Sequence, residues 1–302
     1  MPVFIGSSTI MLLGINAILF LTMHTSEIHQ WHDGHFYSPI PDKEDVRQRR
    51  KSHILHKDIP GINLREQEQL QFLQQLAPLC REQPLPKTSE PNWHYNFEDG
   101  KNFSYADAIV LQAMLRFLRP QRCIEVGSGW SSCIFLDIQK HMFAHDCYYA
   151  CIDPFPHTLQ KVMNDIDRAH CDLYAQPVQD IPTALFEELQ TGDILFIDSS
   201  HVCKAESDVH FLFTEALPRL RSGVHIHFHD IFHPFDYPLS WIEEGRSWNE
   251  AYVLHSFLQY NSRFEITLWN DFLFQFHCDA FLSSIPLAAN NPGGSLWLQV
   301  QT

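Results

Sequence analysis

Short apolar runs alternate with amphipathic stretches over the second half of the chain. The apolar runs lie at 123–126, 148–152, 194–197 and 224–228, with a weaker run at 173–178. Helical patterns lie between them, near 130–141, 157–168, 182–190 and 205–220. Strands that are apolar throughout and separated by helices are typical of a parallel sheet covered on both faces.

The pattern continues with a helix near 247–260 and strands near 263–269 and 295–300. We therefore predict an α/β fold: a doubly wound, Rossmann-like, mainly parallel seven-stranded sheet with helices on both faces. Upstream, 63–80 and 105–118 have helical spacing and predict an N-terminal helical extension. The expected divisions are an apolar segment at 1–30, a helical cap region at 31–120 and a ligand-binding domain at 121–302.

Residues 2–23 contain no charged residue and are long enough to be a transmembrane candidate. Ser7, Thr9 and Asn16 interrupt the stretch, and no Lys or Arg precedes it, which argues against a secretory signal. Two interpretations stay open: a membrane anchor, or an extension that packs on the protein or precedes the true start, with Met23 as an alternative start.

Net charge limits the classes of partner that the chain can bind, and cysteine usage indicates its cellular compartment. The chain of 302 residues has a net charge of −15, and all of the acidic excess lies in 61–302. Such a surface repels phosphate backbones, so we expect no nucleic-acid partner, and the basic run 47–51 is interpreted as a solvated face. None of the eight cysteines forms a C-x-x-C pair, so zinc-ribbon and thioredoxin spacings are absent. Several lie inside apolar runs, as buried thiols do, and this usage favours a reducing compartment. We predict a cytoplasmic protein, with membrane association through 2–23 left open.

Polar residues follow the apolar runs where a sheet of this kind binds ligands. The first group, 125–132 (EVGSGWSS), comes after a strand and opens a helix, so glycines and free N–H groups can meet a ligand. No Gly-Lys-Ser/Thr sequence ends this group, which excludes a phosphate loop. A dinucleotide-binding fingerprint would have Gly or Ala at the position of Ser132, so the group also departs from that motif. Glu125 would repel phosphates and suits a positively charged ligand.

The other groups carry acids and histidines. Asp153 ends the second strand, where an acid can accept hydrogen bonds from ribose hydroxyls or cap a helix. Asp198 and His201 follow the fourth strand and could bind a metal or relay a proton.

Three histidines alternate along the fifth strand and share one face. Three side chains in a straight line do not readily meet one ion, so His225 and His227 are interpreted as core residues. His229 and Asp230, at the open end of the strand, are the functional candidates.

Together these groups resemble class I S-adenosylmethionine-dependent methyltransferases. The resemblance is greatest to a bacterial branch of small O-methyltransferase-like proteins (methyltransferase family 24-like) with an Ile-Asp-x-Ser-His motif. It is carried by 125–132, Asp153, 198–201 and 229–230, and the later stretches 231–238 and 248–250 (Trp-Asn-Glu) are also similar to that branch. The resemblance extends from about Phe36 to the C-terminus.

The resemblance implies S-adenosylmethionine as cofactor. Its methionine part would lie on the loop of Gly127, Ser128 and Gly129, with Glu125 near its amino group. Asp153 would bind the ribose, Gln179 and Asp180 would lie near the adenine, and Asp198 would also contact the cofactor. Metal-dependent members hold a divalent cation such as Mg²⁺ with acids at the positions of Asp198 and Asp230, followed by an Asn that is Ile231 here.

The expected reaction is methylation of a hydroxyl on a small molecule or a saccharide. His201 is our candidate base, with Asp198 orienting it or binding the metal, and His229 is the second candidate. The aromatic stretch 232–248 is expected to line the acceptor pocket. The alternatives are a nicotinamide-dependent oxidoreductase and a non-catalytic scaffold that binds cofactor or a partner protein. The sequence predicts no oligomeric state.

Overall fold

The computed structural model describes residues 30–52 and 54–302. The described residues divide into a large compact unit, 55–241 and 248–302, and a smaller unit that contains 30–52, 54 and 242–247. The apolar segment 2–23, with Met23, lies outside the described residues. Within the described part, no helix is both long and apolar enough to span a membrane.

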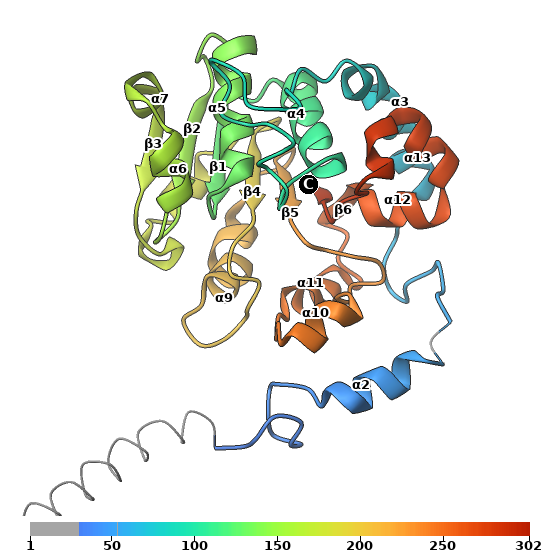
Figure 1. The fold of residues 1–302 in the computed structure, drawn as a ribbon. Helices are drawn as coiled ribbons and strands as arrows, with labels where there is room; N and C mark the ends of the chain where they lie inside the picture. Colours follow the sequence, from blue (N-terminus) through green and yellow to red (C-terminus); the bar gives the residue numbers. More distant parts are fainter. Residues whose placement is uncertain (1–29, 53) are drawn as a thin grey trace, which may run out of the picture. The chain divides into compact units, whose positions relative to one another are not determined.

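The large unit contains the predicted sheet (Figure 1). Its strands are β1 (Arg122–Val126), β2 (Tyr148–Ile152), β3 (Cys171–Tyr174), β4 (Ile194–Ile197), β5 (His225–Phe228), β6 (Phe264–Trp269) and β7 (Leu296–Val300). They lie in the order β3-β2-β1-β4-β5-β7-β6. The first five are parallel, and β7 runs antiparallel between β5 and β6. The seven-stranded, mainly parallel sheet is therefore confirmed.

Strand β1 pairs with β2 on one side and with β4 on the other, so the strand order reverses at this point. Right-handed connections leaving in opposite directions place their helices on opposite faces of a sheet. All four residues of β4 and of β5 are buried, as strands covered on both faces require. The loops after β1 and β4 diverge at the reversal, and this is where such sheets open a ligand crevice.

The helices of the large unit are α3 (Glu66–Arg81), α4 (Ala106–Leu118), α5 (Trp130–Met142), α6 (His157–Val162), α7 (Asp165–His170), α8 (Ala184–Glu187), α9 (Asp208–Phe211), α11 (Glu250–Leu258), α12 (Asn270–Phe276) and α13 (Cys278–Ser284). Helix α10 (Leu239–Glu244) runs across the boundary at residue 242. Short helical segments of other types are labelled η. The 3₁₀ segments are η1 (Val178–Asp180), η3 (Leu217–Arg219) and η4 (Pro286–Ala289), and η2 (Leu212–Ala216) is π-helical. Helices α4 and α5 lie side by side (Figure 1). Because α3 contacts α4 and β6, both cap helices belong to the same compact unit as the sheet.

Several boundaries differ from the prediction for local reasons. The helix expected over 157–168 is two helices, because the Asn164 side chain accepts hydrogen bonds from two amides and starts α7. The helix expected over 205–220 passes through the π-helical η2 and ends in η3, which contains Pro218. Strand β3 begins two residues earlier than predicted. Helices α2, α10, α12 and α13 were not predicted.

The smaller unit contains α2 (Lys43–Arg50), which Asp42 caps by accepting a hydrogen bond from the Asp45 amide. Arg47 pairs with Glu243 at 2.7 Å. No residue of α2 is buried, so the basic run is a solvated face, as the sequence indicates. In the chain as a whole all eight cysteines are free thiols, and six of them are buried.

Candidate active site

A cavity of about 560 Å³ opens at the carboxyl ends of β1, β2 and β4. Its walls come from the loops that follow these strands and from η1. Gly127, Ser128, Asp153, Gln179 and Asp198 line it, as the sequence predicts for a ligand site at this edge. The volume is that of a pocket for a small molecule or cofactor.

The turn from β1 into α5 brings the backbone close to the end of β4. Gly127 has a φ of +91°, and a Cβ on it would lie 1.8 Å from the carbonyl oxygen of Asp198. Only glycine allows both this conformation and this approach. Gly129 differs, because its backbone is extended and a Cβ there would meet no atom within 4 Å. Gly129 caps α5 and does not line the cavity.

Glu125 requires a correction to the predicted contact with the cofactor. Its side chain is fully buried and does not line the cavity. Ser131 and Ser132 donate their hydroxyls to its two oxygens at 2.6 and 2.7 Å, and Tyr149 donates a third hydrogen bond. Burial raises the pKa of Glu125 to about 7, against these hydrogen bonds. Glu125 therefore holds the first turn of α5 and does not face the cavity.

Asp153 faces the cavity from the end of β2. It accepts hydrogen bonds from the Ser128 hydroxyl at 2.5 Å and from the Phe155 amide at 2.7 Å. Elsewhere in the cavity wall, the side-chain amide of Gln179 donates a hydrogen bond to the backbone carbonyl of Glu206 at 2.6 Å. Asp180, expected beside Gln179, is exposed and does not line the cavity, because its position in the 3₁₀ turn η1 points it away.

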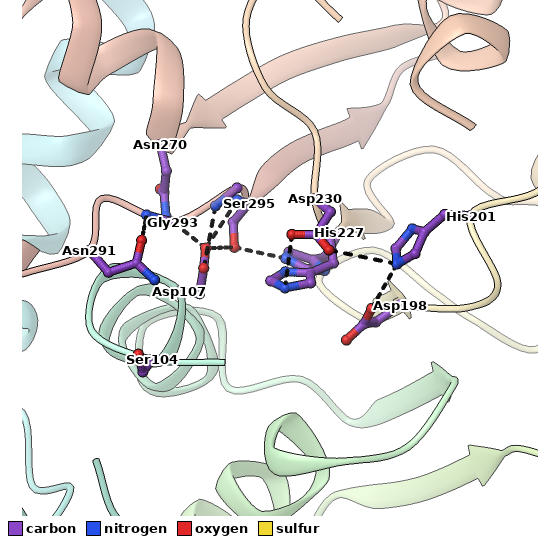
Figure 2. Close-up of polar contacts among 12 residues, drawn as sticks. Ser104, Asp107, Asp198, His201, His227, Asp230, Asn270, Asn291, Gly293 and Ser295 are labelled. Carbon is purple, nitrogen blue, oxygen red and sulfur yellow. Dashed lines mark hydrogen bonds and ion pairs between the residues drawn. The ribbon is translucent and has the colours of Figure 1, made fainter. Parts of the chain in front are cut away.

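Two carboxylates converge on His201 at the rim of the cavity (Figure 2). Its Nε2 lies 3.4 Å from Asp198 Oδ1 and 3.8 Å from Asp230 Oδ2. His201 is only 5% exposed. Because Asp198 also lines the cavity, it connects the cavity with this cluster.

The charges of the cluster reinforce one another. Burial disfavours the charged imidazole, but the carboxylates of Asp198 and Glu250 hold the pKa of His201 well above its ordinary value. Burial also opposes the charge of Asp198, yet the nearby His229 and His201 lower its pKa to about 2. A half-buried carboxylate and a buried imidazole that perturb each other beside a cavity indicate a functional site.

The chain matches a family model described as a methyltransferase domain over residues 124–231. A protein from Archaeoglobus fulgidus, itself uncharacterised, is 32% identical over 165 residues, which are 53% of this chain and 74% of that protein. This chain belongs to the class I S-adenosylmethionine-dependent methyltransferases.

Solved methyltransferases with the same kind of fold match most of the chain at low identity. A Podospora anserina methyltransferase with S-adenosylhomocysteine bound is 12% identical over 88% of this chain and 99% of its own, with a TM-score of 0.43. An O-methyltransferase from Streptomyces achromogenes, involved in tomaymycin synthesis and bound to S-adenosylmethionine, is 15% identical over 85% of this chain and 96% of its own, with a TM-score of 0.42.

The residues of this methyltransferase at the cavity fit its cofactor. The ribose needs a hydrogen-bond acceptor at the end of β2, and Asp153 supplies a carboxylate there. A sulfonium carries a positive charge that a carboxylate stabilises, and Asp198 lines the cavity with a carboxylate. The positive φ of Gly127 lets the chain pass the cavity without a side chain filling it.

The donor set does not fit the divalent cation that the resemblance implied. Over residues 30–52 and 54–302, no three His, Cys, Asp or Glu side chains lie where they could hold a metal ion. Asp198 and Asp230 face the His201 imidazole instead of a shared open position. Ile231, where metal-dependent members have an Asn, is fully buried and offers no ligand atom. We therefore derive no step through a metal.

The alternating histidines occupy different environments. His227 is fully buried, stacks on Phe196 at 3.9 Å and contacts the Ser295 hydroxyl at 2.9 Å (Figure 2). His225 contacts Gln299 at the opposite end of β5. Burial lowers the pKa of both, as the interpretation of core residues requires. His229 lies beyond the strand with its Nε2 3.6 Å from Asp230, away from the cavity wall.

Two groups of functional candidates were missed at the sequence level. Lys204 and Glu206, from the loop after β4, and Asp208, the first residue of α9, line the cavity, and no motif marks them. Glu250 contacts His201 from α11, 49 residues along the chain. The stretch Trp248-Asn249-Glu250 did belong to the family resemblance, and that was the one available signal.

Proposed function

We propose that this methyltransferase transfers the methyl group of S-adenosylmethionine to a hydroxyl of a small molecule or a saccharide. The observation that carries the proposal is the position of Asp198. It lines the cavity and also lies 3.4 Å from the His201 imidazole. The cofactor cavity and the candidate base are thus joined through one carboxylate.

Two side chains and one loop would hold the cofactor. Asp153 would accept hydrogen bonds from the ribose hydroxyls, and Gln179 would lie beside the adenine. The loop at Gly127 and Ser128 would hold the methionine part, with Glu125 acting through the first turn of α5. When bound, S-adenosylmethionine supplies an electrophilic methyl group on a sulfonium. The residues around it contribute chiefly by holding the two reactants in line.

His201 would take the proton of the acceptor hydroxyl. Only its neutral form can do so, and the neighbouring carboxylates favour the charged form. The pKa of His201 falls when a second positive charge lies beside Asp198, because like charges disfavour protonation. We therefore expect turnover to increase with pH across the titration of His201.

The acceptor side would be aromatic. The Trp248 ring lies 4.4 Å from the His201 ring, and Trp241 contacts Trp248 edge-on at 5.4 Å. Aromatic faces of this kind bind flat phenolic rings and the apolar faces of sugars. Phenols and sugar hydroxyls both remain within the proposed acceptor class.

Calorimetry with S-adenosylhomocysteine and with NAD tests the cofactor first. We expect binding of the former only, whereas an oxidoreductase would bind NAD. Turnover is then measured as S-adenosylhomocysteine released from S-adenosylmethionine with a panel of phenols and methyl glycosides. A chain that binds the cofactor but methylates nothing across a broad panel would be a scaffold.

His201→Ala tests the base. We expect cofactor affinity to be retained and turnover to fall about 10²- to 10⁴-fold, the range of general-base catalysis. His170→Ala, an exposed histidine at the end of α7, is the matched control. Full turnover by His201→Ala would refute the assignment.

A further inference from the structure

Glu250 begins α11 with a carboxylate that is fully buried. Its Oε2 lies 2.8 Å from Nδ1 of His201, the closest polar contact of that imidazole. An ionised carboxylate can only accept in such a bond, so Nδ1 is the donor whenever Glu250 carries its charge. The other nitrogen, Nε2, is then the one that faces Asp198 and Asp230.

The same helix start also holds the backbone around His201. The amides of Asn249 and Glu250 both donate to the His201 carbonyl, at 3.0 and 3.1 Å. The Asn249 side chain accepts from the Cys203 amide at 2.6 Å and donates to the Cys203 carbonyl at 3.2 Å. His201 itself has a φ of +59°, a left-handed conformation that requires support.

These backbone contacts make the charge of Glu250 unnecessary for holding the loop. A buried carboxylate is costly, and Glu250 Oε1 has no hydrogen-bond partner among residues 30–52 and 54–302. A neutral residue at this position would avoid that cost while Asn249 still held the loop. The specific contribution of the carboxylate is its bond to Nδ1, which selects one tautomer and one ring orientation.

We propose that Glu250 is a positioning residue for the methyl transfer, which fixes His201 with Nε2 directed toward Asp198, the carboxylate that lines the cofactor cavity. The proposal rests on the proposed role of His201. Glu250 does not line the cavity, so it acts through His201 and not on the cofactor.

Glu250→Gln tests the proposal, with Glu187→Gln as the matched control. The control removes the same charge from an exposed pair with Arg219, where little effect is expected. For Glu250→Gln we expect unchanged affinity for S-adenosylhomocysteine and little change in KM. We expect kcat to fall about 10²-fold, the lower end of a general-base contribution. Loss of a merely structural residue would instead weaken cofactor binding and stability together.

Imidazole ¹⁵N–¹H NMR of the whole chain with S-adenosylhomocysteine gives a readout that needs no acceptor. The His201 signals are assigned by their loss in His201→Gln. We expect a deshielded Nδ1 proton in the parent chain, as for an imidazole bonded to a carboxylate, and its loss in Glu250→Gln. Asn249→Ala, which releases the loop contact but keeps the carboxylate, should retain that signal.

Two outcomes separate the failure of this proposal from failure of the proposed function. If Glu250→Gln turns over like the parent while His201→Ala is inactive, Glu250 does not position the base but the base assignment stands. If neither variant affects turnover, the role of His201 is wrong. Should Glu250→Gln not fold, Glu250→Asp keeps the charge with a shorter reach. It must then show a reduced kcat and a shifted Nδ1 signal, and parent values for both would overturn the proposal.

Discussion

Replacing Gly127 by alanine perturbs the point where β1 and β4 meet at the cavity. At a φ of +91°, the added Cβ would lie 1.8 Å from the Asp198 carbonyl oxygen and 2.7 Å from its carbonyl carbon. Both are backbone atoms of the strand end that carries the candidate site. Neither can be relieved by a side-chain rotation, so the two loops must separate.

The expected cost has two parts. A left-handed conformation costs a residue with a side chain about 1–2 kcal/mol. Forcing packed atoms apart costs about 1–3 kcal/mol more, so Gly127→Ala should lose about 2–5 kcal/mol of unfolding free energy. This is a large share of the roughly 5–15 kcal/mol of a typical domain. Turnover should fall as well, because the backbone of Asp198 moves.

Gly129→Ala is the control, two residues away in the same loop. Its added Cβ meets no atom within 4 Å and its backbone is extended, so only the poorer N-cap remains as a cost, and the unfolding free energy should fall by about 1 kcal/mol or less. Urea unfolding of both variants and the parent, followed by circular dichroism, measures the difference. Equal midpoints for the two variants would show that the close approach of β1 and β4 is not as the structure has it.

Two further predictions concern single carboxylates. Asp153→Asn should weaken S-adenosylmethionine binding about 10- to 100-fold, since a hydrogen bond to a charged group is worth about 1.5–3 kcal/mol. Asp180→Asn, outside the cavity, should not, and calorimetry that finds equal losses would contradict the placement. Burial raises the pKa of Glu125 from 4.5 to about 7, so the folded chain binds a proton more tightly than the unfolded chain. Stability should therefore fall as pH rises through this range, by about 3 kcal/mol at most. Glu125→Gln should lack that fall, and parallel pH profiles of unfolding for variant and parent would refute it.

The sequence predicts those parts of the fold whose burial leaves a periodic signature. Residues 194–197 are apolar and buried on both faces, so their run indicates a central strand directly. In α12, Phe272, Phe274 and Phe276 alternate with a period of two, which conceals a helix that packs beside α13. The segment 205–220 changes from α9 to the π-helical η2 and then to η3, and a helical apolar spacing does not distinguish these helix types.

The candidate site likewise contains residues that the sequence alone places and residues that only the tertiary structure places. Asp153 and Asp198 end apolar strands, so topology alone brings them to one edge. Asp180 was misplaced because a 3₁₀ turn changes the direction of successive side chains within three residues. Glu125 lies at the right edge, but one position before the strand end, where its side chain is directed into the core. The contact of Glu250 with His201 spans 49 residues and requires the tertiary structure.

Two residues of the cluster, His201 and Asp230, have left-handed backbones, with φ of +59° and +57°. Such conformations persist only where surrounding contacts enforce them, and they gather at functional sites. Helix α11 supports His201, and Asp230 is supported by the loop before β7, where the Gly294 carbonyl accepts from the Ile231 amide at 2.8 Å. The buried Asp107 holds that loop in turn, accepting from the Ser295 amide and hydroxyl at 3.0 and 2.6 Å (Figure 2). The family match ends at residue 231, so the matched part carries the cavity and the reactive groups. Elements outside that match, α4, α11 and the loop before β7, set their geometry.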